Sequence, residues 1–410
     1  RGGYEDELLV LFDGVRLYNP FHLKDFQGLF GLIDPETLDS VEYYSGGFPA
    51  WYGGRSGGVM DISPRQAEGM QTLLGLSFLV SRLISSGEAF EGRGQWLAGY
   101  RRSNLGAVIR SLERDVGEPE FEDFVLRYQH DLGPDTQLTI GLLGLDDRLD
   151  LFTEDRSEVA TASYRDRYIW GAVEHHWSER LSTRLRFNDA RLSARRFGDV
   201  SRPGIGFGEL EDRRETDIDL IGIDFTLTPA TGLRVHWGLE ASDVSAQYDY
   251  RSVASFAEPL AATFGQDAFE ERAFTGAPDG RVYAGYLTGR LELGRWLGEF
   301  GVRWDRATYL DDGDIWSPRI SLRRDLGSAT TLRVTAGRYA QFQSINELDA
   351  EDAEPLFAEP ESSWHTIVSL EHDFDTTLML RAEAFYKRTN DVRRRFESQL
   401  DPLVLLPEVE

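Results

Sequence analysis

Histidines are the first residues in this sequence that could bind a metal ion or move a proton. His175 and His176 are adjacent, and neighbouring residues of a strand point to opposite faces, so their imidazoles cannot share one ion. The other histidines are scattered and lack the spacing of metal ligands: His22, His130, His236, His365 and His372. We therefore predict that the histidines serve packing or surface roles, with no metal site among them.

Acidic pairs and one glycine-rich run are the other candidate sites. Asp146-Asp147, Asp311-Asp312 and Glu351-Asp352 could bind divalent cations, although solvated acidic loops are the more common origin of such pairs. The glycines of 204–208 resemble a phosphate-binding loop, but the strand–helix–strand context that such a loop needs does not follow. We predict no catalytic residues, no cofactor and no enzymatic activity.

The overall charge and composition restrict the class of protein. The formal net charge of −26 would repel a polyphosphate, so we exclude nucleic acid as a partner. The chain has no cysteine and therefore no disulfide or thiolate site. No stretch approaches the roughly 20 apolar residues of a membrane-spanning helix. Aromatic residues and 41 glycines are plentiful, which favours many strands with one wet face.

From about residue 71 onward, apolar and polar residues alternate in long segments such as 221–228 and 233–242. This period of two predicts strands with one apolar and one wet face. A basic residue on a lipid-contacting face would cost about 2–4 kcal/mol at the membrane midplane. We therefore expect these charged strand residues to point to a wet interior: Arg234, Glu240, Glu299 and Arg303.

The connections alternate between short turns and longer polar loops, as in barrels that span an outer membrane. The longer loops are predicted at 149–160, 197–214, 251–278, 311–316 and 342–362. A short amphipathic helix is predicted at 105–116. We count about fifteen strands, whereas bacterial single-chain barrels have an even number. We therefore expect the chain to stop before the barrel closes.

Residues 1–66 have a different sequence pattern, in which short runs of apolar residues are separated by glycines. Asp13-Gly14 is a strong turn signal because glycine readily adopts positive φ. The pairs Gly46-Gly47 and Gly53-Gly54 allow close backbone approach. Arg55 lies among these glycines and is expected to pair with a carboxylate of the barrel wall.

The segments 9–22, 33–44 and 46–62 together resemble the plug domain of TonB-dependent outer-membrane receptors. The resemblance implies an all-β fold: an antiparallel transmembrane β-barrel, about 15 strands present of an expected 22, with a partial mixed α/β plug. Residues 1–66 would be the C-terminal part of the plug and 67–410 an incomplete barrel. The plug motif consists of Asp13, Gly14, Gly46, Gly47, Tyr52, Gly53, Gly54, Arg55 and Gly57.

The same resemblance implies a function. The receptor would import a large solute such as a siderophore, cobalamin or an oligosaccharide, by energy-coupled movement of the plug. Its expected partners are outer-membrane lipid and lipopolysaccharide, an extracellular solute, and the TonB complex, whose contact segment is absent from this sequence. We expect a monomer in the outer membrane of a Gram-negative bacterium.

Solute capture is assigned to the loops 197–214, 251–278 and 342–362. Aromatic residues of the second loop are candidate solute contacts: Phe256, Phe264, Phe269 and Phe274. One alternative is a passive or adhesive barrel, which the plug motif disfavours because an open pore needs no plug. Another is a soluble β-propeller, disfavoured because the turns recur at irregular intervals and the strands are long for propeller blades.

Overall fold

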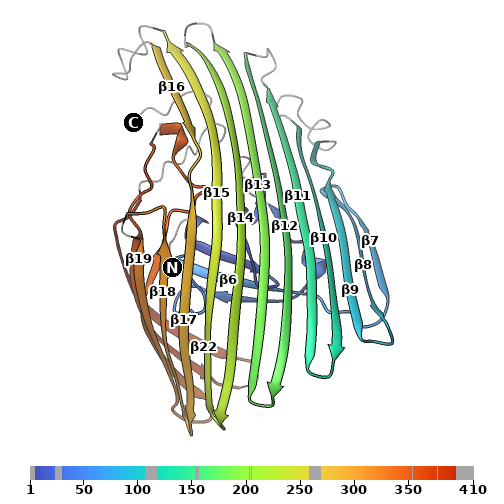
Figure 1. Cartoon of the computed structure of the whole chain (residues 1–410), viewed down its shortest axis with the longest axis vertical. Helices are drawn as coiled ribbons and strands as arrows, with labels where there is room; N and C mark the ends of the chain where they lie inside the picture. The colour runs from blue at the N-terminus through green and yellow to red at the C-terminus, as the bar shows by residue number, and fades with distance from the viewer. Residues whose placement is uncertain are drawn as a thin grey trace.

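The computed structural model describes residues 5–23, 30–106, 118–152, 157–202, 204, 206–257, 269–311, 313–352, 354–375 and 377–393. Most of these residues lie in strands, which form one large sheet, one small sheet and a separate two-stranded pair (Figure 1). Within these ranges no helix has the length and apolar character needed to cross a membrane.

The large sheet is antiparallel and runs without interruption from β7 to β22. Its strands are β7 Gln71–Leu76, β8 Val80–Ala89, β9 Gly94–Ser103, β10 Glu118–Gly133, β11 Thr136–Phe152, β12 Glu158–Ser178, β13 Leu181–Arg202, β14 Gly206–Ala230, β15 Leu233–Phe256, β16 Phe269–Gly276, β17 Asp279–Leu293, β18 Trp296–Ala307, β19 Asp314–Asp325, β20 Thr330–Gln341, β21 Glu361–Asp373 and β22 Met379–Asn390. Among the described residues β7 and β22 are not paired with each other, so the sheet is a curved, open wall. One continuous sheet excludes the propeller, whose blades are separate small sheets.

The strand that sequence reasoning missed is β16, which continues the line of β17. Both pair with β15 in one register, since Ser245 faces Asp279 and Tyr248 faces Gly276. Pro278 lies between them and has no N–H to donate, although its carbonyl still accepts from the Ala246 amide at 2.9 Å. The ladder is therefore interrupted without a shift, and the remaining fifteen strands match the predicted ones.

The wall is tallest at β13 to β15. Strand β14 has 25 residues and β18 has 12, whereas about 9–11 residues suffice to cross a membrane. On the convex face of β14, Ile221 is 56% exposed, and steps of two residues lead to Asp219 and Asp217. The apolar part of this face suits lipid and the charged part suits water. The prediction that charged strand residues point to the interior holds for Glu240 and Arg303, which lie on the concave side and line the cavity there.

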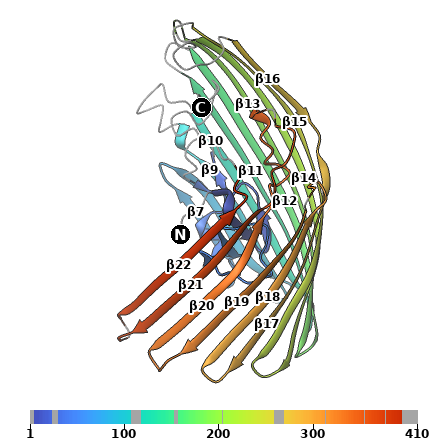
Figure 2. The ribbon, with the colours of Figure 1, turned by 90° about the vertical axis from the view of Figure 1, so that its left-hand side faces the viewer.

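The small sheet lies inside the concave face of the wall (Figure 2). Its order is β2-β1-β6-β5, from Val15–Leu17, Leu8–Phe12, Gly58–Pro64 and Leu38–Tyr44, with β1 and β6 parallel. A separate pair, β3 Phe21–His22 and β4 Phe30–Gly31, and the 3₁₀ helices η1 Glu5–Glu7 and η2 Pro35–Thr37 complete this part; η3 Ala350–Asp352 follows β20. Phe12 and Leu17 share a hydrophobic core with Leu143 and Tyr168 of the wall.

Two of the predicted loops are wrong. Most of 197–214 is strand, because β13 continues to Arg202 and β14 begins at Gly206. Likewise 251–278 contains the end of β15 and all of β16. These strand ends keep one buried face, with Val200 and Leu210 each 3% exposed, but their many charged residues hid the alternation from sequence reasoning. The predicted helix at 105–116 lies outside the described residues, apart from its first two positions.

Candidate functional site

The small sheet and the separate pair β3–β4 are held on the wall by several groups of polar contacts, and a buried histidine of that pair forms the first. His22, the last residue of β3, is 0% exposed. Its Nδ1 lies 2.6 Å from Asp147 Oδ1, and its Nε2 lies 3.1 Å from Asp123 Oδ2. Ionised carboxylates only accept hydrogen bonds and a neutral imidazole has one N–H, so the imidazolium is the form that satisfies both partners.

We call His22, Asp123, Asp147 and Arg101 the His22 cluster. Arg101 donates from Nε to Asp123 at 2.7 Å, and the Leu23 amide donates to Asp147 at 2.6 Å. Burial alone lowers the pKa of His22, but its hydrogen bonds to Asp123 and Asp147 and their negative charges outweigh burial and raise that pKa above 6.5. Two cations and two anions therefore balance in a dry contact between β3, β9, β10 and β11.

The turn between β1 and β2 forms the second contact. Asp13 and Gly14 both have positive φ, 52° and 82°, as a two-residue hairpin turn requires. The Asp13 carboxylate accepts a hydrogen bond from Arg127 Nε at 2.9 Å and another from Trp170 Nε1 at 2.9 Å. The predicted turn is thus confirmed, and its side chain reaches strands β10 and β12.

Two arginines of the wall bind backbone carbonyls of the connection between β5 and β6. Arg319 Nη1 donates to the Tyr52 carbonyl at 2.8 Å and also to the carbonyl of Pro49. Arg303 Nη1 donates to the Trp51 carbonyl at 3.1 Å. Because these contacts use backbone acceptors, any side chain at 49, 51 or 52 would keep them, and sequence reasoning could not single them out.

The fourth contact joins the small sheet to the connection between β20 and β21. Arg55 Nη2 lies 2.6 Å from Glu347 Oε1, so the ion pair predicted for Arg55 is present. Arg393 Nη1 lies 3.3 Å from the other oxygen of Glu347. Burial raises the pKa of Glu347, but the charges of Arg55, Arg393 and Arg16 lower it more strongly, to about 2. The carboxylate is therefore charged at any ordinary pH.

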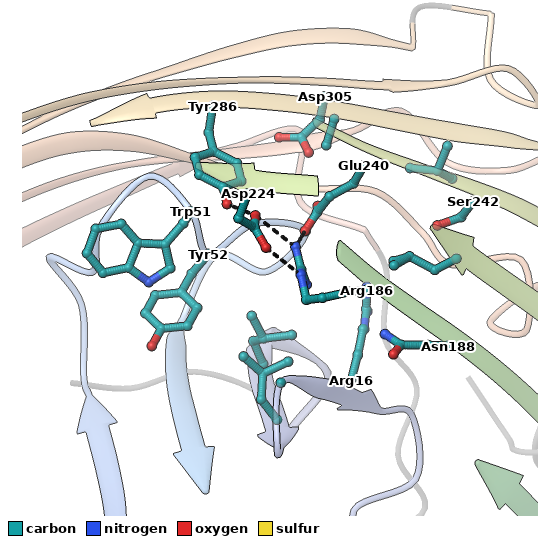
Figure 3. A pocket seen from close by; sticks show the side chains of 18 of the residues that line it. Arg16, Trp51, Tyr52, Arg186, Asn188, Asp224, Glu240, Ser242, Tyr286 and Asp305 are labelled. Carbon is teal, nitrogen blue, oxygen red and sulfur yellow. Dashed lines mark hydrogen bonds and ion pairs between the residues drawn. The ribbon is translucent and has the colours of Figure 1, made fainter. Parts of the chain in front are cut away.

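Between these contacts lies a cavity of about 470 Å³, bounded by β1, β2 and residues 51–54 on one side and by β13 to β18 on the other (Figure 3). A wall cluster of five charged residues lines it. Arg186 Nε bonds Asp224 at 2.6 Å, and Arg186 Nη2 bonds Glu240 at 2.9 Å. Arg303 bonds Glu240 at 3.0 Å and Asp305 at 2.8 Å. Each charge of the cluster has a partner of opposite sign, but the three carboxylates outnumber the two guanidiniums, so this part of the cavity wall is polar with an excess of negative charge.

This arrangement attaches the inner strands to the wall. In the described part of the chain, no three His, Asp or Glu side chains are grouped as a metal site would require. The polar contacts surround a cavity and accompany the hydrophobic core that Phe12 and Leu17 share with the wall. Each polar contact can be exchanged for water singly.

Comparison with known proteins identifies this architecture. A family model described as TonB dependent receptor-like, beta-barrel, matches residues 81–400. The chain belongs to the TonB-dependent receptor family. No curated protein sequence matches it.

Solved transporters of this kind share the fold. They include the outer membrane transporter YddB from Escherichia coli (TM-score 0.66, 11% identity, 93% of this chain and 61% of that one) and the siderophore receptor PirA from Acinetobacter baumannii (0.67, 13%, 95% and 63%). A third is Pseudomonas aeruginosa FpvA bound to heterologous pyoverdines (0.66, 12%, 93% and 56%). The chain thus spans about three-fifths of the length of these transporters.

The motif residues predicted for a TonB-dependent receptor are distributed over these contacts. Asp13 and Gly14 form the turn, and Arg55 binds Glu347. Tyr52, Gly53 and Gly54 line the cavity, and Tyr52 Oη donates to Asp61 at 2.7 Å. Gly47 and Gly57 lie where the backbone packs closely against neighbours, and Gly46 has a positive φ of 133°. At Gly53 a Cβ would lie 1.9 Å from Arg303 Nε, so glycine is required there.

The four candidate solute contacts are not brought together by what the structure describes. Phe274 lies on β16 and packs edge-on against Tyr248 with ring centroids 6.1 Å apart. Phe269, five residues earlier on the same strand, points to the opposite face and is 57% exposed. Phe264 and the side chain of Phe256 lie outside the described residues.

Sequence reasoning missed His22, Asp147 and Trp170 as attachment residues. Asp147 was predicted to lie in a solvated acidic pair, but it is 2% exposed and only Asp146 points outward, to Arg165. Strand alternation could have separated the two carboxylates. Trp170 is 3% exposed and faces inward, toward the small sheet.

Proposed function

We propose that this chain is part of an outer-membrane receptor of a Gram-negative bacterium that imports a large polar solute by energy-coupled movement of a plug. Residues 1–66 would be the C-terminal part of the plug and 67–410 part of the barrel. The observation that carries the proposal is the small sheet inside the curved wall, held by polar contacts that surround a cavity. PirA is named a siderophore receptor and FpvA is bound to pyoverdine, so ferric siderophores are the first solutes to test.

Reversible attachment supports a plug that moves. An ordinary hydrogen bond contributes about 0.5–1.5 kcal/mol net, because water replaces the partner when the bond breaks. Contacts such as Arg303 to the Trp51 carbonyl can therefore open in sequence. A passive pore has no need of a sheet inside its wall, and an adhesive barrel has no need of a polar cavity beside that sheet.

The experiment compares uptake in cells that express the full-length protein, with and without a functional TonB complex. Labelled ferric siderophores, cobalamin and oligosaccharides are supplied separately. We expect uptake of one class, abolished by loss of TonB or by a protonophore, while surface binding remains. Uptake that persists without TonB would favour a passive barrel, and binding without any uptake would favour an adhesive one.

Solute capture by the tall side of the wall is a part of this proposal. Phe274 faces the concave side and Phe269 the convex side, so the two make a matched pair of substitutions. Phe274→Ala should weaken binding of the imported solute and Phe269→Ala should not. Equal affinities for both variants would remove β16 from the capture surface.

A further inference from the structure

The attachment of the small sheet is uneven around the wall. Toward β10 to β12 it is held by the His22 cluster, by Asp13, and by Asn19, whose Nδ2 donates to Asp166 at 2.9 Å. Toward β18 and β19 the arginines Arg303 and Arg319 hold its carbonyls. These are the two edges of a gap.

The gap in the polar attachment lies along strands β13 to β15. Within the described residues, no hydrogen bond or ion pair joins 8–18 or 46–62 to these three strands. The contacts on this side are apolar or between rings: Trp51 lies edge-on to His236 with centroids 5.2 Å apart, and Ile218 and Val244 belong to the same hydrophobic core as the small sheet. The cavity of about 470 Å³ fills this side, and its lining runs from Ser182, beside a short turn, to Ser344, in the connection after β20.

The side chains that line this gap include polar groups not used by the wall cluster. Arg16 lies toward the loop end and Arg184 toward the short-turn end. In the described part of the chain neither guanidinium has a carboxylate within 4.0 Å, whereas Arg186 and Arg303 are each paired. Asn188 also lines the cavity (Figure 3). The carboxylates of Asp61 and Glu174 line it as well, so the charges of the cavity are of both signs.

We propose that the solute passes the plug on this side, along β13 to β15, and that the passage, lined by charges of both signs, favours hydrophilic solutes. The inference rests on the proposed function. Passage requires separation of 51–54 from Arg303, because a cavity of this volume holds a small molecule but not a large solute. The His22 cluster would stay closed and keep the other side of the plug on the wall.

Single cysteines test the route, because the chain contains none of its own. Asn188→Cys and Ser242→Cys place a thiol in the cavity lining. Thr139→Cys is the matched control, at an inward position that is 7% exposed on β11, on the attached side. Each variant is made in the full-length protein in cells, and a heat-modifiable band confirms its assembly. The two cavity positions serve as replacements for each other if one fails to assemble.

The thiols are treated with anionic sulfonatoethyl or cationic trimethylammonioethyl methanethiosulfonate, in energised cells and after a protonophore. We expect both cavity thiols to react with both charged reagents, because the cavity lining carries charges of both signs. Energisation should accelerate both cavity thiols further and leave Thr139→Cys unchanged. Cavity thiols that react with neither charged reagent would overturn the hydrophilic character of the passage.

The failure of this inference differs from the failure of the proposed function. If energisation accelerates Thr139→Cys but not the cavity thiols, the plug moves and the route lies on the other side. If uptake is TonB-dependent and no thiol responds to energy, the route along β13 to β15 is wrong. If uptake itself is independent of TonB, the proposed function fails first.

Discussion

Replacing His22 by alanine should release the small sheet from β10 and β11. The side chain is 0% exposed, and both ring nitrogens are bonded to carboxylates that are themselves buried. Removing one partner of a buried charge pair costs about 3–5 kcal/mol, because the remaining charge has no compensation. Arg101 still compensates Asp123, so the lower part of that range is expected. Asp147 keeps the Leu23 amide but loses its only cation in the cluster.

The pH dependence of this effect has a definite sign. The pKa of His22 is raised in the folded protein, because two carboxylates outweigh burial. The contribution of His22 is therefore fully present below the unfolded value of 6.5, and it is lost as pH rises through the raised folded pKa. Wild type and His22→Ala should differ most at pH 6 and converge under alkaline conditions.

The assay is amide hydrogen exchange followed by mass spectrometry on the protein in outer-membrane vesicles. The opening free energy of residues 30–37 is compared between wild type and variant, with intrinsic exchange rates corrected at each pH. His372→Ala is the control, since the ring of His372 bonds a hydroxyl, that of Thr330 at 2.8 Å, in place of a carboxylate. A difference below about 1 kcal/mol at pH 6, the size of an ordinary neutral hydrogen bond, would refute the imidazolium cluster. A difference that grows with pH would refute its charge state.

Three further substitutions test the faces of the wall and the other contacts. Ile223→Arg puts a cation on the convex, lipid-contacting face of β14, at a cost of about 2–4 kcal/mol near the midplane, so the yield of heat-modifiable protein should fall. Thr226→Arg faces the cavity and should assemble. Equal yields of the two variants would contradict the assignment of Ile223 to the lipid and Thr226 to the interior. Gly53→Val forces a side chain against Arg303 and should lower the opening free energy of the 45–57 connection, measured by hydrogen exchange, by about 1–3 kcal/mol. Gly31→Val is the control and should have no such effect, because the space around Gly31 is open. Glu347→Gln should open the same connection at pH 7. In wild type the contribution of Glu347 is present above pH 4.5 and lost as pH falls toward about 2, so opening at pH 5 would contradict the lowered pKa.

The strands of the wall were predictable because the alternation of apolar and polar residues that marks a strand involves residues close together in the sequence. Alternation along β14 or β15 fixes which residues face lipid, and a turn such as Gly232, with φ of 80°, marks where each hairpin reverses. Segments 197–202 and 206–214 escaped because few apolar residues mark their inner face, where Val200 and Leu210 are buried but Asp212 is buried as well. β16 escaped because Pro278 separates it from β17.

The contacts between the sheets were less predictable, since they join residues far apart in the chain. Gly53 and Arg55 were found from a family motif, and Arg55 has its predicted ion pair. His22 was taken as an ordinary packing residue because its two carboxylates lie more than 100 positions away. Nothing in the local sequence distinguishes the inward Asp147 from its outward neighbour Asp146 except strand parity.

Two of the charged attachments, those of His22 and Glu347, respond to pH in opposite directions, and this predicts the order in which they open. His22 loses its contribution as pH rises, whereas Glu347 loses its contribution as pH falls toward about 2. Between about pH 4.5 and 6.5 both contribute fully, so acidity within that range releases neither. Alkaline exchange should therefore open residues 30–37 first, and strong acid should open 45–57 first. If both segments open together at each extreme, the small sheet leaves the wall as one body, and stepwise opening along the β13 to β15 side is wrong.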